Sequence, residues 1–248
     1  MNNLVNTEFE KRNKSKIGKM YNDNELKKLT KKWFNSSVKY EYSFHFTWLG
    51  IPIIQYPQDM VALQEIIWDV KPDLIIETGI AHGGSLIFFA SMLEILGKGK
   101  VLGIDIDIRK HNKRAIEKHH LNKRIKMIQG SSIDKKIIDK VYAFSKNSKK
   151  ILLILDSNHT HKHVLEEMKS YSPLIKKGSY MVVFDTTIED IPKELFKGKA
   201  KRSWGKGNNP KTAVHEFLKS NKRFKIDKEL ENKLLITVGP DGFLKCIK

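Results

Sequence analysis

Five short apolar runs, each followed by a stretch long enough for a helix, constrain the fold of this 248-residue chain more than any other feature. The runs are rich in Ile, Leu and Val and are bounded by Gly, Asp or Ser, which is typical of strands buried on both faces. They span Asp73–Glu77, Val101–Asp105, Ile125–Gln129, Ile151–Leu155 and Tyr180–Phe184. The segments that we expect to be helical between and after them are Ser85–Leu96, Lys110–His120, Asp134–Ser145 and His161–Lys176. This alternation predicts an α/β fold with a mostly parallel sheet and helices on both of its faces.

The end of the chain breaks the alternation. Phe224–Asp227 and Leu234–Val238 are both strand-like in composition. Gly239–Gly242 is typical of a turn and leads into a third apolar run, Phe243–Ile247. We therefore expect a C-terminal antiparallel hairpin at one edge of the parallel sheet.

Residues 1–45 differ from the rest of the chain because they are polar and rich in lysine. Within Asn24–Phe34 the apolar residues Leu26, Leu29, Trp33 and Phe34 recur at helical spacing. We predict an N-terminal arm over residues 1–45 with a short amphipathic helix, followed by a catalytic domain over 46–248. The helix either packs on the main domain or belongs to an arm that covers a site or a neighbouring subunit, and the second alternative favours a homo-oligomer.

The chain is strongly basic, with 46 Lys and Arg against 28 Asp and Glu and a formal net charge of +18. Only six of the basic residues are arginine, the side chain best suited to forked phosphate recognition, so we interpret most of the charge as solvated surface lysine rather than a nucleic-acid footprint. The single cysteine, Cys246, allows no internal disulfide. Because we find neither an apolar signal segment nor a stretch long enough to cross a bilayer, we expect a cytoplasmic protein.

Polar residues stand where the predicted strands end, which is where ligands bind in open parallel sheets. The first strand leads into a glycine-rich turn from Glu77 to Ser85, with neither the spacing of a dinucleotide fingerprint nor that of a phosphate loop. Asp105 ends the second strand and is suited to accept hydrogen bonds from two ribose hydroxyls. After the third strand, Ser131 or Ser132 either contacts an adenine edge or caps the next helix.

Carboxylates also follow the fourth and fifth strands. Asp156 and Asp185 could together supply the oxygen ligands that Mg²⁺ prefers. His159, three residues after Asp156, would then serve as a general base. His161 and His163 suggest a transition-metal site as an alternative, but both fall at the start of a helix, where residues two apart do not share a face.

Residues Gly205–Thr212 are similar to the phosphate-loop motif, but Pro210 replaces the second glycine and offers no N–H group. We interpret Asn209 as the N-cap of a helix with Pro210 in its first turn. The long segment Thr187–Asn209 in front of it is then a predicted lid.

Four of these motifs occur together in a known family. The runs E-T-G-x-x-x-G-G-S, G-I-D-I-D, L-D-S-N-H-T-H and W-G-x-G-N-N-P-K-T-A-V resemble the cephalosporin hydroxylase / rhamnosyl O-methyltransferase family over Trp48 to Lys248. That family is similar in fold to class I S-adenosylmethionine-dependent methyltransferases. The resemblance therefore implies a Rossmann-like sheet of seven strands, mostly parallel, with the last strand antiparallel.

The resemblance also implies a role for each strand end. Asp105 would hold the ribose of S-adenosylmethionine, Ser132 would lie by the adenine, and Asp156 would bind Mg²⁺ close to the cofactor while His159 removes the proton of the acceptor hydroxyl. The residues implied at the methionine part of the cofactor are Glu77, Gly79, Ala81, Gly83 and Ser85. Related enzymes carry a Glu-Asp pair after the fifth strand, whereas this chain has Phe184-Asp185, so Glu189 or Asp190 would substitute as the third metal ligand.

These observations predict an S-adenosylmethionine-dependent, Mg²⁺-assisted O-methyltransferase that acts on a hydroxyl of a sugar or glycosylated small molecule. Two alternatives stay open. One is a hydroxylase-like enzyme, although nothing in the chain resembles an iron site built from two histidines and a carboxylate. The other is a non-catalytic module that binds nucleic acid or an acidic glycan through its lysines.

Overall fold

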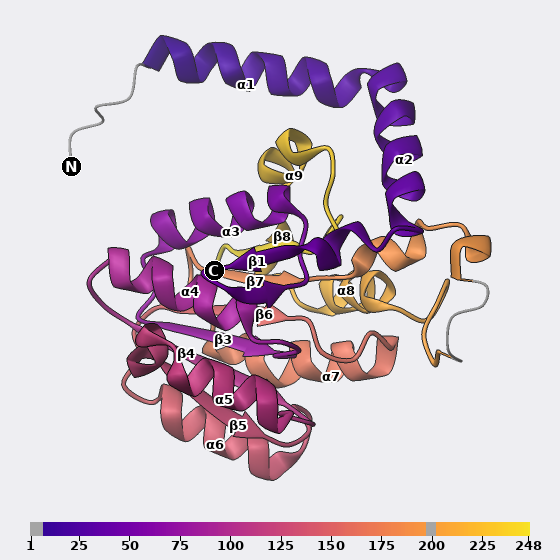
Figure 1. The fold of residues 1–248 in the computed structure, drawn as a ribbon. Helices are drawn as coiled ribbons and strands as arrows, with labels where there is room; N and C mark the ends of the chain where they lie inside the picture. Colours follow the sequence, from indigo (N-terminus) through magenta and orange to yellow (C-terminus); the bar gives the residue numbers. More distant parts are fainter. Residues whose placement is uncertain (1–6, 197–201) are drawn as a thin grey trace.

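In the computed structural model, which describes residues 7–196 and 202–248, one seven-stranded sheet organises the molecule (Figure 1). All but one of its strands run parallel, and β9 pairs antiparallel with both β7 and β8. In spatial order the strands are β5 (Ile125–Gln129), β4 (Lys100–Asp105), β3 (Leu74–Thr78), β6 (Ile151–Leu155), β7 (Tyr180–Val183), β9 (Phe243–Cys246) and β8 (Phe224–Ile226). The predicted α/β class, the five parallel strands and the C-terminal antiparallel hairpin are confirmed.

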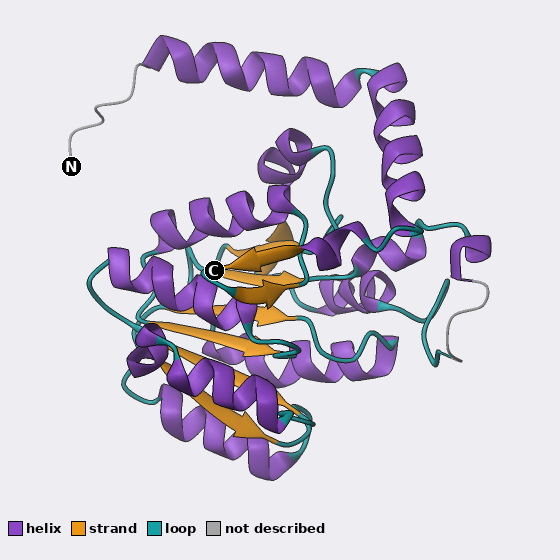
Figure 2. Ribbon diagram, viewed as in Figure 1, coloured by secondary structure: helices purple, strands orange, loops and turns teal. Residues whose placement is uncertain are grey.

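Helices cover both faces of the sheet (Figure 2). One apolar core packs the first face beneath α3 (Pro57–Val70), α4 (Gly84–Ile95) and α5 (Lys110–Lys118). A second core packs the other face beneath α6 (Lys135–Ser145), α7 (His161–Tyr171) and α8 (Pro210–Ser220). Strands β3, β6 and β7 are buried along their whole length, since alternate side chains enter the two cores. The order of the strands reverses between β3 and β6, and the carboxyl ends of the strands on either side of this point face the same edge.

One predicted strand is wrong. Leu234–Val238 forms the end of α9 (Lys228–Leu234) and an irregular segment, not a strand. The carboxylate of Asp227 starts the helix by accepting a hydrogen bond from Leu230 N, and Leu235 has a left-handed φ of 58° that interrupts any extended path. The N–H of Val238 donates to a carboxylate on α3 rather than to a neighbouring strand. The two strands of the hairpin are thus β8 and β9.

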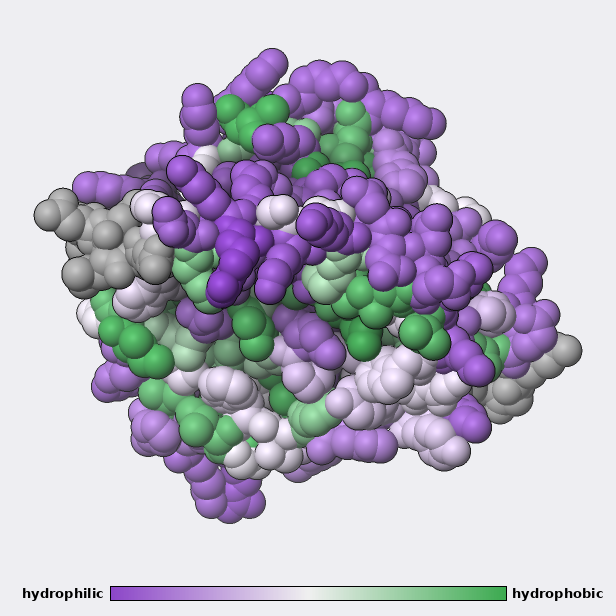
Figure 3. All heavy atoms as spheres, turned by 90° about the horizontal axis from the view of Figure 1, so that it is seen from above, coloured by the Kyte–Doolittle hydropathy of each residue, from purple (hydrophilic) through white to green (hydrophobic). Residues whose placement is uncertain are grey.

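The N-terminal segment forms two helices that stand apart from the sheet (Figure 1). Helix α1 (Thr7–Asn22) buries none of its residues and lies against α9, whereas α2 (Asn24–Val38) turns down toward the edge where the parallel strands end. Figure 3 looks down on this arm and shows hydrophilic side chains over most of the surface, with hydrophobic ones gathered between them. A short 3₁₀ turn, η1 (Tyr42–His45), and an unpredicted hairpin of β1 (Phe46–Trp48) and β2 (Ile51–Ile53) then lead into α3.

Short 3₁₀ turns join several of these elements: η2 (His120–Arg124), η3 (Ser172–Leu174), η4 (Thr186–Glu189) and η5 (Lys193–Phe196). The predicted helix start at Asn209 is confirmed, because its side chain accepts hydrogen bonds from Lys211 N and Thr212 N, with Pro210 in the first turn. The predicted lid over Thr187–Asn209 includes 197–201, which lie outside the described residues. None of the helices described is long and apolar enough to cross a membrane.

Candidate functional site

A cavity of about 580 Å³ lies at the carboxyl ends of the parallel strands. It brings together residues that are far apart in the sequence and that the strand ends predicted. These are Gly79, Ala81, Gly83, Ser85, Asp105, Ser132, Asp156, His159 and Asp185. The opposite wall is formed by the end of α2, by η1 and by the segment after β2, so the arm closes a site whose floor is the sheet.

The glycine-rich turn after β3 comes within contact distance of Asp156, which follows β6, the neighbour of β3 in the sheet. Gly79 has a φ of +90°, and a Cβ atom there would lie 2.1 Å from the carbonyl oxygen of Asp156. Gly84, the first residue of α4, lies against the β1–β2 hairpin, where a Cβ atom would meet the carbonyl oxygen of Pro52 at 2.3 Å. Only glycine permits these approaches, so the turn and the end of β6 form one surface of the cavity.

Glu77 lies beneath this turn at the end of β3. Its side chain is buried, with only 2% of its surface exposed, and Ser85 Oγ donates a hydrogen bond of 2.9 Å to its Oε2 atom. Burial raises the pKa of Glu77 to about 8; the bond from Ser85 opposes that rise, and the nearby charge of Asp105 adds to it. The carboxyl group of Glu77 is therefore poised to ionise when a cationic group approaches.

Asp105 ends β4 and fixes the conformation of the same turn. Its Oδ2 atom accepts hydrogen bonds from the backbone N–H groups of Ile80, at 2.7 Å, and Ala81, at 3.3 Å. Its Oδ1 atom accepts from the N–H of Asp107 at 3.0 Å. Two adjacent strand ends are thereby tied together at the cavity, and a contact of Asp105 with ribose stays a prediction.

Three side chains from the segments that follow β6 and β7 meet on the floor of the cavity. Ligand atoms of Asp156, His159 and Asp185 all lie within 4.8 Å of one another. His159 Nε2 is 3.2 Å from Asp185 Oδ2, and the side-chain amide of Gln55 donates to Asp156 Oδ2 at 3.3 Å. Asp185 holds a left-handed φ of 56°, at the N-cap of η4, which follows β7.

This cluster carries more negative charge than its surroundings stabilise. Asp156 opens onto the cavity but is screened from bulk solvent, and this burial raises its pKa well above the ordinary range of an aspartate. The charge of Asp185 raises the pKa of Asp156 further, followed by that of Glu77. Two carboxylates that face each other with an imidazole beside them can hold a divalent cation, and their oxygens suit Mg²⁺. The donor set fits a metal.

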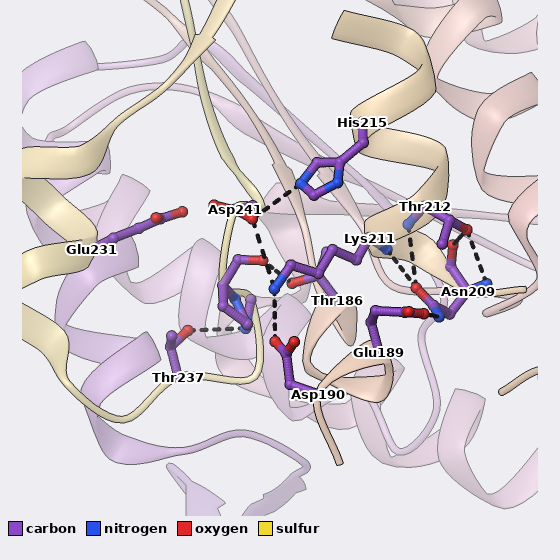
Figure 4. A network of polar contacts seen from close by, with 12 residues as sticks. Thr186, Glu189, Asp190, Asn209, Lys211, Thr212, His215, Glu231, Thr237 and Asp241 are labelled. Atoms are coloured by element: carbon purple, nitrogen blue, oxygen red, sulfur yellow. Dashed lines mark hydrogen bonds and ion pairs between the residues drawn. The ribbon is translucent and has the colours of Figure 1, made fainter. Parts of the chain in front are cut away.

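The structure does not bring Glu189 and Asp190 to this cluster. Both belong to the polar network drawn in Figure 4. Glu189 Oε2 instead accepts hydrogen bonds from Gly207 N, at 2.8 Å, and Asn209 Nδ2, at 2.5 Å. Asp190 pairs with Lys211 at 2.6 Å. Both acidic residues therefore fasten the segment after η4 to the start of α8, and neither is near enough to complete the group formed by the two aspartates.

Several residues that contact the site are given no role there by the sequence patterns. Gln55 and Tyr56 line the cavity from the segment after β2, whose sequence shows no periodic pattern. Trp204 lies edge-on to the imidazole of His159, with ring centroids 5.4 Å apart. Glu167 is buried inside α7 and binds two serines that line the cavity. Only a four-residue spacing from His163 could have drawn attention to it.

The predictions for His161 and His163 have separate outcomes. Both histidines begin α7, as expected. His161 lies toward α8, where its Nδ1 is 2.8 Å from Thr212 Oγ1 and its Nε2 is 3.0 Å from Glu216 Oε2. His163 instead faces the cavity and contacts Ser132. Neither belongs to the group around Asp156, so a site with three histidines does not form within the described residues.

Comparison with known proteins places this geometry in a family. The family model described as "Rhamnosyl O-methyltransferase/CmcI" matches residues 40–247. The rhamnosyl O-methyltransferase of Mycobacterium tuberculosis H37Rv is 32% identical over 215 residues, 86% of this chain and 82% of that protein. The protein of the same name from Mycobacterium leprae is 33% identical over 163 residues, 65% of this chain and 68% of that protein.

Solved structures of CmcI share the fold. The apo-structure aligns with a TM-score of 0.57 at 19% identity and covers 83% of this chain and 77% of that one. A CmcI structure with Mg and SAM aligns with a TM-score of 0.54 at 18% identity and covers 83% of this chain and 78% of that one. At such identities the likeness concerns the path of the chain.

Proposed function

This chain belongs to the rhamnosyl O-methyltransferase/CmcI family, and on that premise we propose that it is a Mg²⁺-assisted O-methyltransferase. It transfers the methyl group of S-adenosylmethionine to a hydroxyl of a sugar or glycosylated small molecule. The observation that carries the proposal is the group formed by Asp156, His159 and Asp185, which shares one cavity with the glycine-rich turn after β3.

The glycine-rich side of the cavity is suited to the methyl donor. S-adenosylmethionine carries a sulfonium and an ammonium cation. Asp105 lines this side of the cavity, and the carboxyl group of Glu77, buried beneath the turn, would ionise when such a cation approaches. In this proposal Gly79 and Gly83 let the backbone approach the methionine part, Ser85 and Ala81 border it, Asp105 holds the ribose and Ser132 lies at the base. The partial exposure of Asp105 and the position of Ser132 in the cavity wall support that assignment.

The carboxylate side is suited to the acceptor. Asp156 and Asp185 would hold Mg²⁺, and Gln55 would keep the Asp156 carboxylate oriented through its amide. A bound Mg²⁺ would polarise the acceptor hydroxyl and direct it toward the methyl carbon. Glu189 and Asp190 are not needed for this role, because water completes the coordination of Mg²⁺ in most protein sites.

His159 removes the proton in the proposed reaction. Asp185 accepts at His159 Nε2, which leaves Nδ1 free to take the hydroxyl proton. As the oxygen–carbon bond forms, the carbon–sulfur bond breaks and its electron pair stays on sulfur, giving a neutral thioether. The side chains mainly hold two substrates in line and exclude water, and Trp204 beside His159 contributes to that exclusion.

The arm would complete the enzyme. We propose residues 1–45 as the arm and 46–248 as the catalytic domain, with the end of α2 and η1 forming part of the acceptor wall. Leu29 and Trp33 on α2 are 62% and 41% exposed, which supports a contact with a second copy of the chain. Calibrated sedimentation would show whether a dimer or larger assembly forms.

Calorimetry with S-adenosylhomocysteine, together with transfer of labelled methyl groups to a panel of rhamnosides, tests the proposal. We expect the wild type to bind S-adenosylhomocysteine and to methylate at least one glycoside only when Mg²⁺ is present. Asp156→Asn and His159→Gln should lower turnover by about 100-fold or more and keep the binding of S-adenosylhomocysteine. His215→Gln, a half-exposed histidine on α8, is the control. Absence of S-adenosylhomocysteine binding by the wild type would refute the proposal.

A further inference from the structure

Helix α7 holds Ser132 from three of its turns. His163, Glu167 and Tyr171 follow one another at a spacing of four residues and therefore share one face of the helix. Ser132 Oγ donates to Glu167 Oε1 at 2.5 Å and lies 3.0 Å from His163 Nε2, and Tyr171 OH donates to the carbonyl oxygen of Ser132 at 2.5 Å. Glu167 and Tyr171 are fully buried. The loop after β5 is thus fixed against α7 at the wall of the cavity.

The same glutamate reaches the loop after β6. Ser157 Oγ donates to Glu167 Oε1 at 2.7 Å, so one carboxylate oxygen joins the loops that carry Ser132 and Ser157. Those loops follow strands that are separated in the sheet by β3 and β4. Both serines line the cavity, whereas Glu167 lies behind them and has no exposed surface. Glu167 therefore acts on the cavity only through the groups that it positions.

This arrangement determines which nitrogen of His163 carries a proton. Ser132 has a single hydroxyl proton and donates it to Glu167, so toward His163 the same oxygen can only accept. Glu167 Oε1, 3.5 Å from His163 Nε2, can also only accept. A neutral His163 is then protonated on Nε2, and its Nδ1 is a hydrogen-bond acceptor. Nδ1 takes part in no hydrogen bond within residues 7–196 and 202–248.

We propose that His163 Nδ1 selects a 6-aminopurine by accepting a hydrogen bond from its exocyclic amino group, and that Glu167 is the positioning residue that fixes this acceptor. The inference rests on the proposed function, since it concerns the base of the same methyl donor. His163 lines the cavity next to Ser131 and Ser132, with 16% of its side chain exposed. A 6-oxopurine would present an oxygen to Nδ1, and two acceptors would face each other without a proton between them.

The test compares two ligands that differ only at this position, S-adenosylhomocysteine and S-inosylhomocysteine, by calorimetry. We expect the wild type to bind the 6-amino ligand about ten-fold or more tightly than the 6-oxo ligand. His163→Phe keeps a ring but has no acceptor, and it should reduce that preference to less than about three-fold. His161→Phe, two residues earlier on the same helix and directed toward α8, is the matched control and should keep the preference of the wild type.

Variants of Glu167 separate positioning from general stability. In Glu167→Gln the amide oxygen still accepts from both serines, so the base preference should persist. In Glu167→Leu the hydroxyl of Ser132 is free to donate to His163 Nε2, the ring proton moves to Nδ1, and the preference should fall or reverse. A variant that only loosens the fold would weaken both ligands alike, which thermal melting would reveal.

The binding results distinguish failure of this inference from failure of the proposed function. Equal binding of the two ligands by the wild type would overturn the inference and leave the proposed function intact. Binding of neither ligand would refute the proposed function and the inference with it. Loss of the preference in His161→Phe, or its retention in both His163→Phe and Glu167→Leu, would also overturn the role assigned to α7.

Discussion

Ser85 Oγ donates a hydrogen bond of 2.9 Å to Glu77 Oε2 and so joins the first turn of α4 to the end of β3. The carboxyl group of Glu77 is buried, and this burial raises its pKa to about 8 although the bond from Ser85 opposes the rise. Near neutral pH the group is therefore largely protonated. The approach of a cationic ligand is what would change its charge.

The first prediction concerns the pH dependence of ligand binding. If the ammonium group of S-adenosylhomocysteine binds near Glu77, ionised Glu77 favours the complex, so affinity should increase as the pH rises from 6.5 to about 8. Calorimetry in buffers of different ionisation enthalpy should show a proton released on binding. Glu77→Gln should flatten the pH profile. Ser85→Ala removes a bond that lowers the pKa of Glu77, so it should move the midpoint to higher pH, and an unmoved midpoint would contradict this account.

A second prediction concerns Asp59, a fully buried residue of α3 that accepts hydrogen bonds from Thr237 Oγ1 and Val238 N. Burial raises its pKa to about 7. The folded state then holds a proton that the unfolded chain releases above pH ~4, so the free energy of unfolding should fall as the pH rises toward 7, by at most about 1.4 kcal/mol per pH unit for this group. Urea denaturation should show a shallower fall in Asp59→Asn, whereas Asp69→Asn, on the exposed side of the same helix, should follow the wild type.

Repulsion between two carboxylates leads to a third prediction. The charge of Asp185 raises the pKa of Asp156, so the proximity of the two carboxyl groups destabilises the metal-free folded state. Asp185→Asn should raise the melting temperature in the presence of a chelator and should remove most of the stabilisation that Mg²⁺ gives the wild type. Methyl transfer should fall by about 100-fold. Melting curves with and without Mg²⁺ test this, and an equal response of variant and wild type to Mg²⁺ would exclude Asp185 as a ligand.

The close approach at Gly79 gives a fourth prediction. Gly79→Ala adds a Cβ atom 2.1 Å from the backbone oxygen of Asp156, at a φ of +90°, and should cost about 3 kcal/mol of unfolding free energy or more. Gly97→Ala is the matched control, because Gly97 also has a positive φ, +72°, but has nothing within 4 Å of the added atom. It should cost only the backbone strain, about 1 kcal/mol. Chemical denaturation of the two variants measures the difference.

The contribution of the arm can be tested at Phe34. This residue of α2 is 9% exposed, stacks on Tyr56 with ring centroids 5.2 Å apart, and lines the cavity. Phe34→Ala should lower the free energy of unfolding by about 3 kcal/mol and raise the KM of the acceptor, with the Kd of S-adenosylhomocysteine unchanged. Lys32→Ala, at an exposed position on the same helix, should alter neither quantity. Steady-state kinetics that show equal KM values would remove the arm from the acceptor wall.

The residues at the strand ends could be predicted from the sequence to lie together, because the topology of a parallel sheet fixes where its strands end. A parallel strand buried on both faces is recognisable from its composition, and the carboxyl ends of such strands must meet at one edge of the sheet. Asp105, Asp156 and Asp185 therefore fall around one cavity, although 80 residues separate the first from the last. The glycine-rich turn was recognisable as well, because Gly79 and Gly83 adopt φ values of +90° and +92°, which residues with a side chain rarely take.

The other features of the fold and the site depend on tertiary contacts that the spacing of residues in the sequence does not reveal. Glu189 and Asp190 are close to Asp185 in sequence, but η4 turns the chain away and Glu189 serves the backbone of Gly207 instead. The segment Leu234–Val238 has the composition of a strand, but Asp227 caps the start of a helix, α9, that extends to Leu234. Gln55 reaches Asp156 across 101 positions from a segment with no pattern of its own. Tertiary packing decides such cases.

The family model begins at residue 40, so Phe34 and Val38, which line the cavity from α2, lie outside the matched region. The strand ends that would hold the methyl donor and the metal lie inside it. A change confined to the end of α2 would therefore reshape the acceptor wall and leave those strand ends as they are. The residues that would choose the acceptor and those that would carry out the transfer thus belong to separate parts of the chain.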